Sequence, residues 1–526
     1  MPAYLVPTPP AVAEHTSFAM AEAEFAKLRN DLLAPTLLGA DHAATEAEIR
    51  VRGTEVMRLL FEGWCNVRAT AIPIREVTGS DDVHRTHRRD AGRDVESLFG
   101  TVEVNRERVG ARGVEALVPG DALLNLARDR FTFGVRQRVV EEAVRGSFEA
   151  AVKAIGTSTG ADVAKRQAEE LVVRASVDFD AFYEENSRDI GEPLPAKMLL
   201  VLTADGKGVV MRHDSLRDAT RKAAETAKPK LESRLSKGEK ANRKRMTTVA
   251  AIYFVEPNPR TAATILGEAG SEPAALRPKP TRKRLFASLK KTPREVIGEA
   301  FEEAERRDPE HRHRWVALVD GNKTQILEIR EAAEEARVGV TLVLDLIHVT
   351  EYLWKAAWEF HKEGDPAVEK WIAKYLRMIL DGKASTVAAA IRRSATANKL
   401  EKRTNIDKAA KYFLNKKDLM RYDEYLRDGL PIGTGVIEGA CRYLVKDRMD
   451  ITGARWGLDG AEAVLLLRSL AVSEDLERYW PFHRVREFER NHRSRYAEDV
   501  NGDPKPRPPG EQRMRPSSSA ASARSR

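Results

Sequence analysis

The sequence contains only two cysteines, Cys65 and Cys441, among 526 residues. Two cysteines cannot make a disulfide framework, and neither stands in a Cys/His spacing typical of a zinc site. No stretch approaches the roughly 18 uncharged apolar residues that span a bilayer. The first residues also lack the basic and continuous apolar regions of a secretory signal. These absences predict a cytoplasmic protein without a membrane segment or structural zinc.

Positive charge is unevenly distributed. The formal net charge is +8, and the segment from Arg221 to Arg245 holds ten Lys or Arg against three Glu. Residues 484–526 hold eleven basic against six acidic residues, and a Pro- and Ser-rich end predicts a disordered basic tail over residues 483–526. Clustered cations attract polyanions, because neutralised phosphates release counterions. A solvated helix face and a solubilising tail would explain the same charges, so both interpretations stay open.

Residues 1–120 predict a mostly helical region with a short strand pair. Apolar residues recur at helical spacing between residues 15 and 75, and residues 95–110 alternate as strands do. This part of the chain therefore predicts a small mixed domain.

Residues 121–190 predict a helix-turn-helix. The pattern is a helix broken at Gly156 and a second helix capped by Ser158 or Thr159. The second helix would present three polar side chains outward, of types that contact DNA. They are Lys165, Arg166 and Gln167. Helix pairs joined by a glycine turn are also common in helical proteins, so a purely structural pair remains an alternative.

From residue 195 onward the pattern changes to strands alternating with helices, which predicts an α/β core. The four predicted strands are residues 198–205, 246–257, 315–320 and 340–345. Residues 364–430 are helical and charged, and they predict an α-helical insertion. The core would therefore be built from residues 195–363 and 431–482.

Three of these strands end in aspartate, at Asp205, Asp320 and Asp345. The carboxyl ends of sheet strands line the crevice in which α/β proteins bind ligands, so the three carboxylates are expected to converge. A fourth acid, Glu438, falls in the first turns of a helix that follows a glycine-rich segment. Each acid alone also fits a turn former or a helix cap.

Asp205, Asp320 and Glu438, with a helical insertion before the last acid, resemble the DDE triad of ribonuclease-H-like transposases. The resemblance is to bacterial insertion-sequence transposases of the ISKra group, which are related to the Mutator-like elements. DLIH, from Asp345 to His348, resembles their C/D(2)H signature. The similarity extends over RGSFEAAV, TGADVAKRQAEEL, DFDAFY, GTGVIEGACRYLVKDRM and ARWG, roughly residues 90–475.

This resemblance implies a ribonuclease-H-like α/β core and cleavage of DNA at terminal inverted repeats, followed by strand transfer. Asp205, Asp320 and Glu438 would be the catalytic residues and would hold two Mg²⁺ or Mn²⁺ ions, because hard cations prefer oxygen ligands. The partner would be double-stranded DNA, both transposon ends and target, in the nucleoid. A protein that joins two ends is expected to act as a homodimer or higher oligomer.

Asp345 competes with Asp320 for the second position of the triad. In a ribonuclease-H-like sheet residues 315–320 would lie beside residues 198–205, and residues 340–345 would lie one strand further out. Distance therefore favours Asp320, and Asp345 and His348 would support the site. A histidine that packs the start of a helix explains His348 equally well.

Further side chains are candidates for DNA binding. They are Arg243, Lys244 and Arg245 in the basic segment, Arg442, Lys446 and Arg448 after Glu438, and Trp456 in GARWG. Trp456 would stack on an exposed base, although a tryptophan in the core is the commoner case. Two alternatives to a transposase stay open: a ribonuclease-H-like nuclease or resolvase without strand transfer, and a non-catalytic DNA-binding descendant of a transposase.

Overall fold

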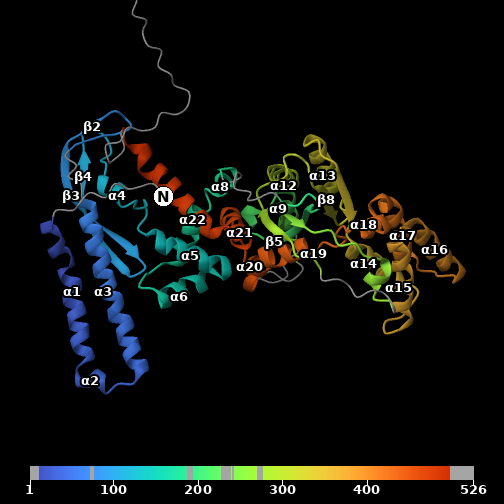
Figure 1. Ribbon diagram of the computed structural model, residues 1–526, viewed down its shortest axis with the longest axis horizontal. Helices are drawn as coiled ribbons and strands as arrows, with labels where there is room; N and C mark the ends of the chain where they lie inside the picture. Colours follow the sequence, from blue (N-terminus) through green and yellow to red (C-terminus); the bar gives the residue numbers. More distant parts are fainter. Residues whose placement is uncertain are drawn as a thin grey trace, which may run out of the picture. The chain divides into compact units, whose positions relative to one another are not determined.

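The computed structural model describes residues 11–70, 76–185, 194–226, 239, 242–268 and 277–497. Contacts divide them into two compact units. Unit 1 holds the described parts of Met1–Val135, Gly156–Asp162 and Arg484–Arg526, and unit 2 holds those of Arg136–Ile155 and Val163–His483. The predicted region 121–190 is therefore shared between the units and is not a separate domain. Figure 1 shows the elements of both.

Unit 1 combines a helical hairpin with a β-hairpin. Its main elements are α1 (Ala11–Leu32), α2 (Pro35–Leu38), α3 (His42–Thr70), β1 (Val77–Thr78), β2 (His84–Arg85), β3 (His87–Ser97), β4 (Gly100–Gly110) and α4 (Pro119–Leu123). Strands β3 and β4 pair from His87↔Gly110 to Ser97↔Gly100 and are longer than the sequence predicted. Val102 and Val104 alternate inward into a core that also holds Cys65 of α3.

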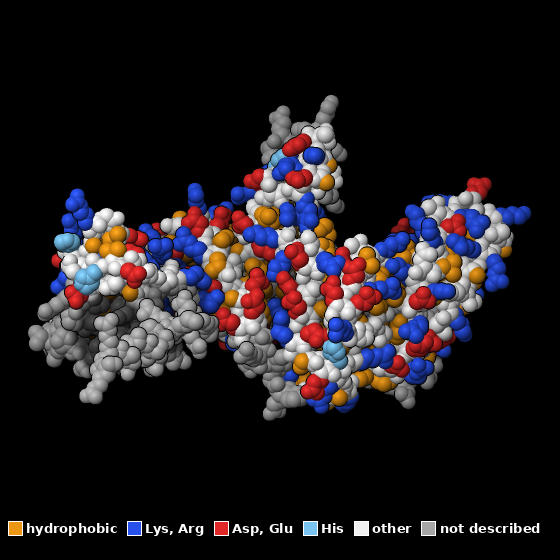
Figure 2. Space-filling view, turned by 90° about the horizontal axis from the view of Figure 1, so that it is seen from above, with side chains coloured by type: hydrophobic (Ala, Val, Ile, Leu, Met, Phe, Trp, Pro, Cys, Tyr) orange, Lys and Arg blue, Asp and Glu red, His pale blue; other side chains and the backbone are white. Residues whose placement is uncertain are grey.

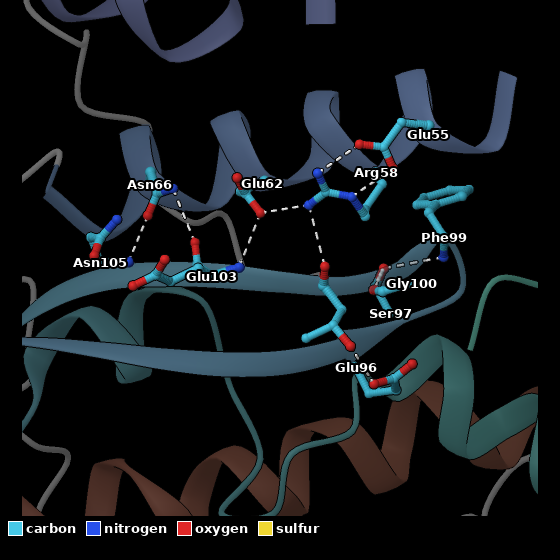
Figure 3. A network of polar contacts seen from close by, with 11 residues as sticks. Glu55, Arg58, Glu62, Asn66, Glu96, Ser97, Phe99, Gly100, Glu103 and Asn105 are labelled. Carbon is cyan, nitrogen blue, oxygen red and sulfur yellow. Dashed lines mark hydrogen bonds and ion pairs between the residues drawn. The ribbon is translucent and has the colours of Figure 1, made fainter. Parts of the chain in front are cut away.

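Polar side chains of α3 bind the free edge of β4 (Figure 3). Asn66 donates to the Glu103 carbonyl at 3.1 Å and accepts from the Asn105 amide at 2.6 Å. Glu62 accepts from the Glu103 amide at 3.1 Å. These bonds satisfy edge groups that a neighbouring strand would otherwise pair.

Unit 2 is built on a five-stranded mixed sheet. Its strands are β5 (Leu199–Val210), β6 (Lys244–Val255), β7 (Thr281–Ser288), β8 (Arg314–Val319) and β9 (Val340–Leu344), in the order β7-β6-β5-β8-β9. β6 is antiparallel to β5 and β7, whereas β8 and β9 run parallel to β5. The predicted neighbours are confirmed: residues 314–319 lie beside β5, and residues 340–344 lie one strand further out.

Several helices belong to the same unit as this sheet. They include α9 (Asp218–Thr226), α11 (Ala262–Leu266), α12 (Pro293–Arg307), α13 (Lys323–Glu335), α14 (Leu346–Ala357) and α21 (Leu458–Val472). α12 packs against β5 and β6, and α21 packs against β7. The predicted insertion is helical, with α15 (Ala367–Leu380), α16 (Ala384–Ala397), α17 (Thr404–Lys416) and α18 (Tyr422–Arg427). α19 (Gly435–Ala440), the π-helical η4 (Cys441–Lys446) and α20 (Asp447–Met449) return the chain to the core.

Two sequence predictions about helices and strands are wrong. Strand β5 does not end at Asp205, because its pairing with β6 continues to Val210 while its pairing with β8 stops at Thr203. Helix α6 (Phe148–Ser158) runs through Gly156, and α7 (Lys165–Ala175) begins after Ala164 rather than at a Ser158 or Thr159 cap. An isolated glycine costs a helix only about 1 kcal/mol, which neighbouring packing offsets. Strand β7 was not predicted, because three of its first four residues are Lys or Arg and do not resemble a buried apolar strand.

The predicted disordered tail is ordered over its first part. Helix α22 (Leu476–Asn491) and η6 (Arg493–Arg495) continue to residue 497, and Tyr496 is buried with Val77, Val109, Leu117 and Ala122. Residues 498–526 lie outside the described residues. No helix within the described ranges has the length and apolar character needed to cross a membrane.

Candidate metal-binding site

Three aspartates occupy one level of three neighbouring parallel strands. Thr203 pairs with Leu318, and Leu318 pairs with Val343. Asp205, Asp320 and Asp345 each stand two residues after one of these three paired residues, Thr203, Leu318 and Val343. Because neighbouring strands lie about 4.8 Å apart, the backbones of the three aspartates lie side by side where β8 and β9 end.

Asp205 lies within β5 and is half-buried. Its carboxylate accepts a hydrogen bond from the Gly206 amide at 2.6 Å and from the Cys441 thiol at 3.4 Å. Burial, assisted by the charge of Asp205, raises the pKa of Cys441, so the thiol remains a donor. Asp205 therefore contacts the helical segment that follows Glu438.

Asp320 begins the turn after β8 and is half-buried. Its carboxylate accepts from the Asn322 amide at 2.7 Å, and its carbonyl accepts from the Tyr412 hydroxyl at 3.1 Å. Gly321 follows with φ +95°, and a Cβ there would lie 2.6 Å from the Tyr412 hydroxyl oxygen. Helix α17 of the insertion thus contacts the turn that carries Asp320.

Asp345 is fully buried and caps α14. It accepts hydrogen bonds from the Ile347 amide at 3.2 Å, the Thr434 amide at 3.1 Å and His348 Nδ1 at 2.8 Å. Burial favours its neutral form, but these donors outweigh burial and hold the pKa of Asp345 below its usual value. The hydrogen bond that His348 donates to Asp345 raises the pKa of His348, and the charge of Asp320 acts in the same direction.

Glu438 lies on α19 with an exposed side chain. Thr434, one turn earlier, donates its hydroxyl to the Glu438 carboxylate at 3.3 Å. Potential ligand atoms of Asp345, His348 and Glu438 all lie within 4.8 Å of one another. In the part of the chain that the structure describes, these three form the only such group.

The site therefore differs in one respect from the sequence prediction. Potential ligand atoms of Glu438 lie within 4.8 Å of those of Asp345 and His348, whereas Asp205 and Asp320 do not belong to this group. Asp205 reaches the Glu438 helix through Cys441, and Asp320 is near enough to influence the pKa of His348. A donor set rich in carboxylate oxygens fits Mg²⁺ or Mn²⁺, and the hydrogen bonds already made by Asp345 suit it to a supporting role.

Of the predicted DNA-binding residues on α7, Lys165 and Arg166 are exposed at the first turn. Gln167 is half-buried and its side chain accepts from the Ala164 amide at 3.0 Å, so that oxygen caps the helix. Helix α7 therefore offers two exposed cations at its first turn.

Strand β6 begins in the predicted basic segment. Lys244 is exposed, Arg243 is half-buried, and Arg245 donates to the Leu289 carbonyl at 2.9 Å. Burial lowers the pKa of Arg245. Residues 227–238 and 240–241 of the segment lie outside the described residues.

After Glu438, Arg442 and Lys446 are exposed, but two other predicted DNA contacts are wrong. Arg448 is 2% exposed and donates to the Ala143 carbonyl at 2.7 Å. Trp456 is buried, donates to the Met449 carbonyl at 2.9 Å, and its ring lies 4.8 Å from the Arg448 guanidinium. Both side chains are part of the interior, as the alternative interpretation of Trp456 expected.

The insertion carries further positive charge. Residues 364–430 contain fifteen Lys or Arg against nine Asp or Glu. Figure 2 shows these cations spread over the visible face of the insertion helices, with acidic side chains among them.

Sequence reasoning missed three residues around the acids: Thr434, Cys441 and Tyr412. Cys441 stands three residues after Glu438, a spacing that places both on one helix face, so helical periodicity offered a signal. Tyr412 lies 92 residues from Asp320, and no local pattern connects them.

No model of a known protein family matches this chain, and a search of curated proteins gives no match either.

Proposed function

We propose that this protein is a metal-dependent DNA-processing enzyme, a DDE transposase that cleaves and joins DNA at the ends of its own element. One observation carries the proposal: Asp205, Asp320 and Asp345 share one level of three adjacent parallel strands, beside the helix that bears Glu438. Carboxylates that lie along one sheet edge repel one another, and a divalent cation bound between them would offset that repulsion.

The order of the strands supports the same proposal. The strand of Asp205 lies between an antiparallel pair and two parallel strands, and a helical insertion separates β9 from the Glu438 helix. Both features are expected from the resemblance to ribonuclease-H-like transposases. The insertion and α7 supply exposed cations suited to DNA phosphates.

Asp205, Asp320 and Glu438 would hold two Mg²⁺ or Mn²⁺ ions, which supply an activated oxygen nucleophile and compensate charge at the phosphorus. The roles of the other residues follow from their contacts. Thr434 orients the Glu438 carboxylate, and Cys441 orients that of Asp205. Asp345 fixes the ring of His348 by taking a hydrogen bond from Nδ1, which leaves Nε2 directed elsewhere as an acceptor.

The experiment uses a labelled duplex that carries the inverted repeats flanking the gene, with Mg²⁺ or Mn²⁺. We expect nicking at the repeat end and joining of the freed 3′ hydroxyl to a target plasmid. Asp205→Asn, Asp320→Asn and Glu438→Gln should each lose at least about a hundredfold in rate, since each removes a ligand charge. Asp418→Asn, at an exposed position of the short 3-10 helix η3 (Lys417–Leu419), is the matched control and should keep the activity.

The outcomes separate the alternatives. Nicking without joining identifies a nuclease or resolvase and refutes transposition. Binding of the duplex without nicking under any metal identifies a non-catalytic DNA-binding protein and refutes the enzymatic proposal altogether.

A further inference from the structure

The helical hairpin of unit 1 exposes an unusual amount of apolar surface. Sixteen large apolar side chains are exposed among the described residues, and nine of them lie between Met20 and Trp64. Clusters of this kind on a folded chain mark interaction surfaces, whereas isolated exposed apolar residues need no explanation. The hairpin is therefore a candidate for a binding surface independent of the acidic site.

On α3 these residues form one stripe. Ile49, Met57, Leu60 and Trp64 are 43%, 51%, 40% and 49% exposed. With Gly53 they are spaced by four, four, three and four residues, which places them on one face of a helix. A Cβ on Gly53 would meet nothing within 4 Å, so the stripe has an open gap at its centre.

The opposite face of α3 is polar and faces its own unit. Arg58, Glu62 and Asn66, each four residues apart, bind the edge of β4 (Figure 3). A helix that packs only within its own chain normally turns its apolar face inward. Helix α3 buries Leu59, Cys65 and Ala69 in its own unit but leaves this second apolar stripe exposed, which is the arrangement expected if a partner covers the stripe.

We propose that this stripe is a homodimer interface, at which α3 packs antiparallel against α3 of a second copy of the chain. The spacing is self-complementary about a twofold axis near Met57. In this register Ile49 lies opposite Trp64, and Gly53 lies opposite Leu60 of the other copy. A large side chain thus meets the gap at glycine, as in knobs-into-holes packing, and an isologous contact of this kind closes as a dimer.

Charge supports a second copy over DNA. Residues 11–70 hold six Lys or Arg against nine Asp or Glu, in a chain whose net charge is +8. The surface would therefore repel a polyanion. The same antiparallel register brings Glu46 opposite Val67, one residue from Arg68 of the second copy, at both ends of the contact. Neither Glu46 nor Arg68 forms an ion pair with the described residues of its own chain.

The size of the surface sets how tight the dimer can be. A helix of 29 residues is about 43 Å long and about 10 Å wide, so the face of α3 is on the order of 430 Å². This is about half of the area, about 800 Å², that each partner buries in an interface of standard size, so we expect a dimer of moderate affinity.

The first test is the mass of the full-length chain in solution by light scattering and sedimentation equilibrium. We expect a dimer, and a monomer at every accessible concentration would overturn the proposal. Met57→Glu combined with Leu60→Glu should weaken dimerisation at least about tenfold, because charges would be buried against apolar side chains. Leu327→Glu, at a 55% exposed position on α13, is the matched control and should remain dimeric.

The second test fixes the register. Met57→Cys should form a disulfide-linked dimer on mild oxidation, because residue 57 lies near its own symmetry mate, and Leu327→Cys should not. Glu46→Arg and Arg68→Glu should each weaken the dimer, and the two together should restore it. A dimer that ignores all these changes has another interface, which overturns the proposal. Circular dichroism and thermal melting check that each variant is folded.

These measurements stand apart from the DNA reaction. A chain that dimerises through α3 but never nicks DNA would refute the proposed function alone, and a nicking monomer would refute the dimer alone.

Discussion

Asp205 and Asp345 carry the same side chain at the same level of the sheet, yet their surroundings differ. Asp205 is half-buried and accepts from one backbone amide and one thiol. Asp345 is completely buried and accepts from two amides and an imidazole. A carboxylate with free oxygen lone pairs is available to a metal ion, whereas a saturated one serves to hold its neighbours.

Replacing Asp345 by Asn should leave the fold intact and change the state of His348. The asparagine oxygen can still accept from Ile347 and Thr434, but its amide would donate to Nδ1 of His348. The proton of the neutral ring would then move to Nε2. Nuclear magnetic resonance titration should show the raised pKa of His348 falling toward its ordinary value of 6.5, because the anionic acceptor is lost.

Activity in Asp345→Asn should fall sharply while the melting temperature changes little, since an imidazole in the wrong tautomer cannot accept or ligate through Nε2. Asp365→Asn is the control, because Asp365 forms a similar 3.0 Å contact with His361 on the insertion. An unchanged titration of His348 in Asp345→Asn would contradict the assigned hydrogen bond.

At the scale of elements, the turn after β8 joins the sheet to the insertion. Gly321 has φ +95° and leaves no room for a Cβ beneath Tyr412. Gly364, with φ +85°, has a similar backbone but open space around it. Comparing substitutions at Gly321 and Gly364 therefore separates the free-energy cost of the backbone conformation from the cost of the clash with Tyr412.

Gly364→Ala should therefore lose about 1–2 kcal/mol, the cost of a Cβ at positive φ. Gly321→Ala should lose clearly more, because Tyr412 must also move and its hydrogen bond to the Asp320 carbonyl is disturbed. Chemical unfolding followed by circular dichroism measures both. Equal losses would show that Tyr412 yields freely and does not position the turn.

The strands that position the acids were predictable because they are buried and apolar. β8 and β9 end where their apolar runs stop, one residue before Asp320 and Asp345. The continuation of β5 past Asp205 was not predictable from GKGVV, because it depends on pairing with β6, more than thirty residues away. Likewise, which acids approach Glu438 most closely depends on the Thr434 segment, whose amide binds Asp345.

At the scale of the whole molecule, the chain passes between its two units four times: after Val135, Ile155, Asp162 and His483. A division into consecutive segments, which is all that composition can suggest, cannot represent such an arrangement. The C-terminal segment shows the consequence most clearly. Its Pro- and Arg-rich composition predicted disorder from residue 483, but Tyr496 and His492 are buried in unit 1.

The first part of this segment should therefore be necessary for the stability of unit 1. His492 bonds to the Leu126 carbonyl at 2.8 Å, and the amide of Ala497 donates to the carbonyl of Thr78 at 3.0 Å. A chain that ends at residue 483 would leave the Leu126 carbonyl without its buried partner, His492. It would also expose Val77 and Val109, which pack against Tyr496. Unit 1 should then melt at lower temperature and be cut faster by protease.

A chain that ends at residue 497 keeps all these contacts and should behave like the full-length protein. If both truncations melt alike, the segment from 484 to 497 contributes nothing to folding, and its role reduces to the charge it carries.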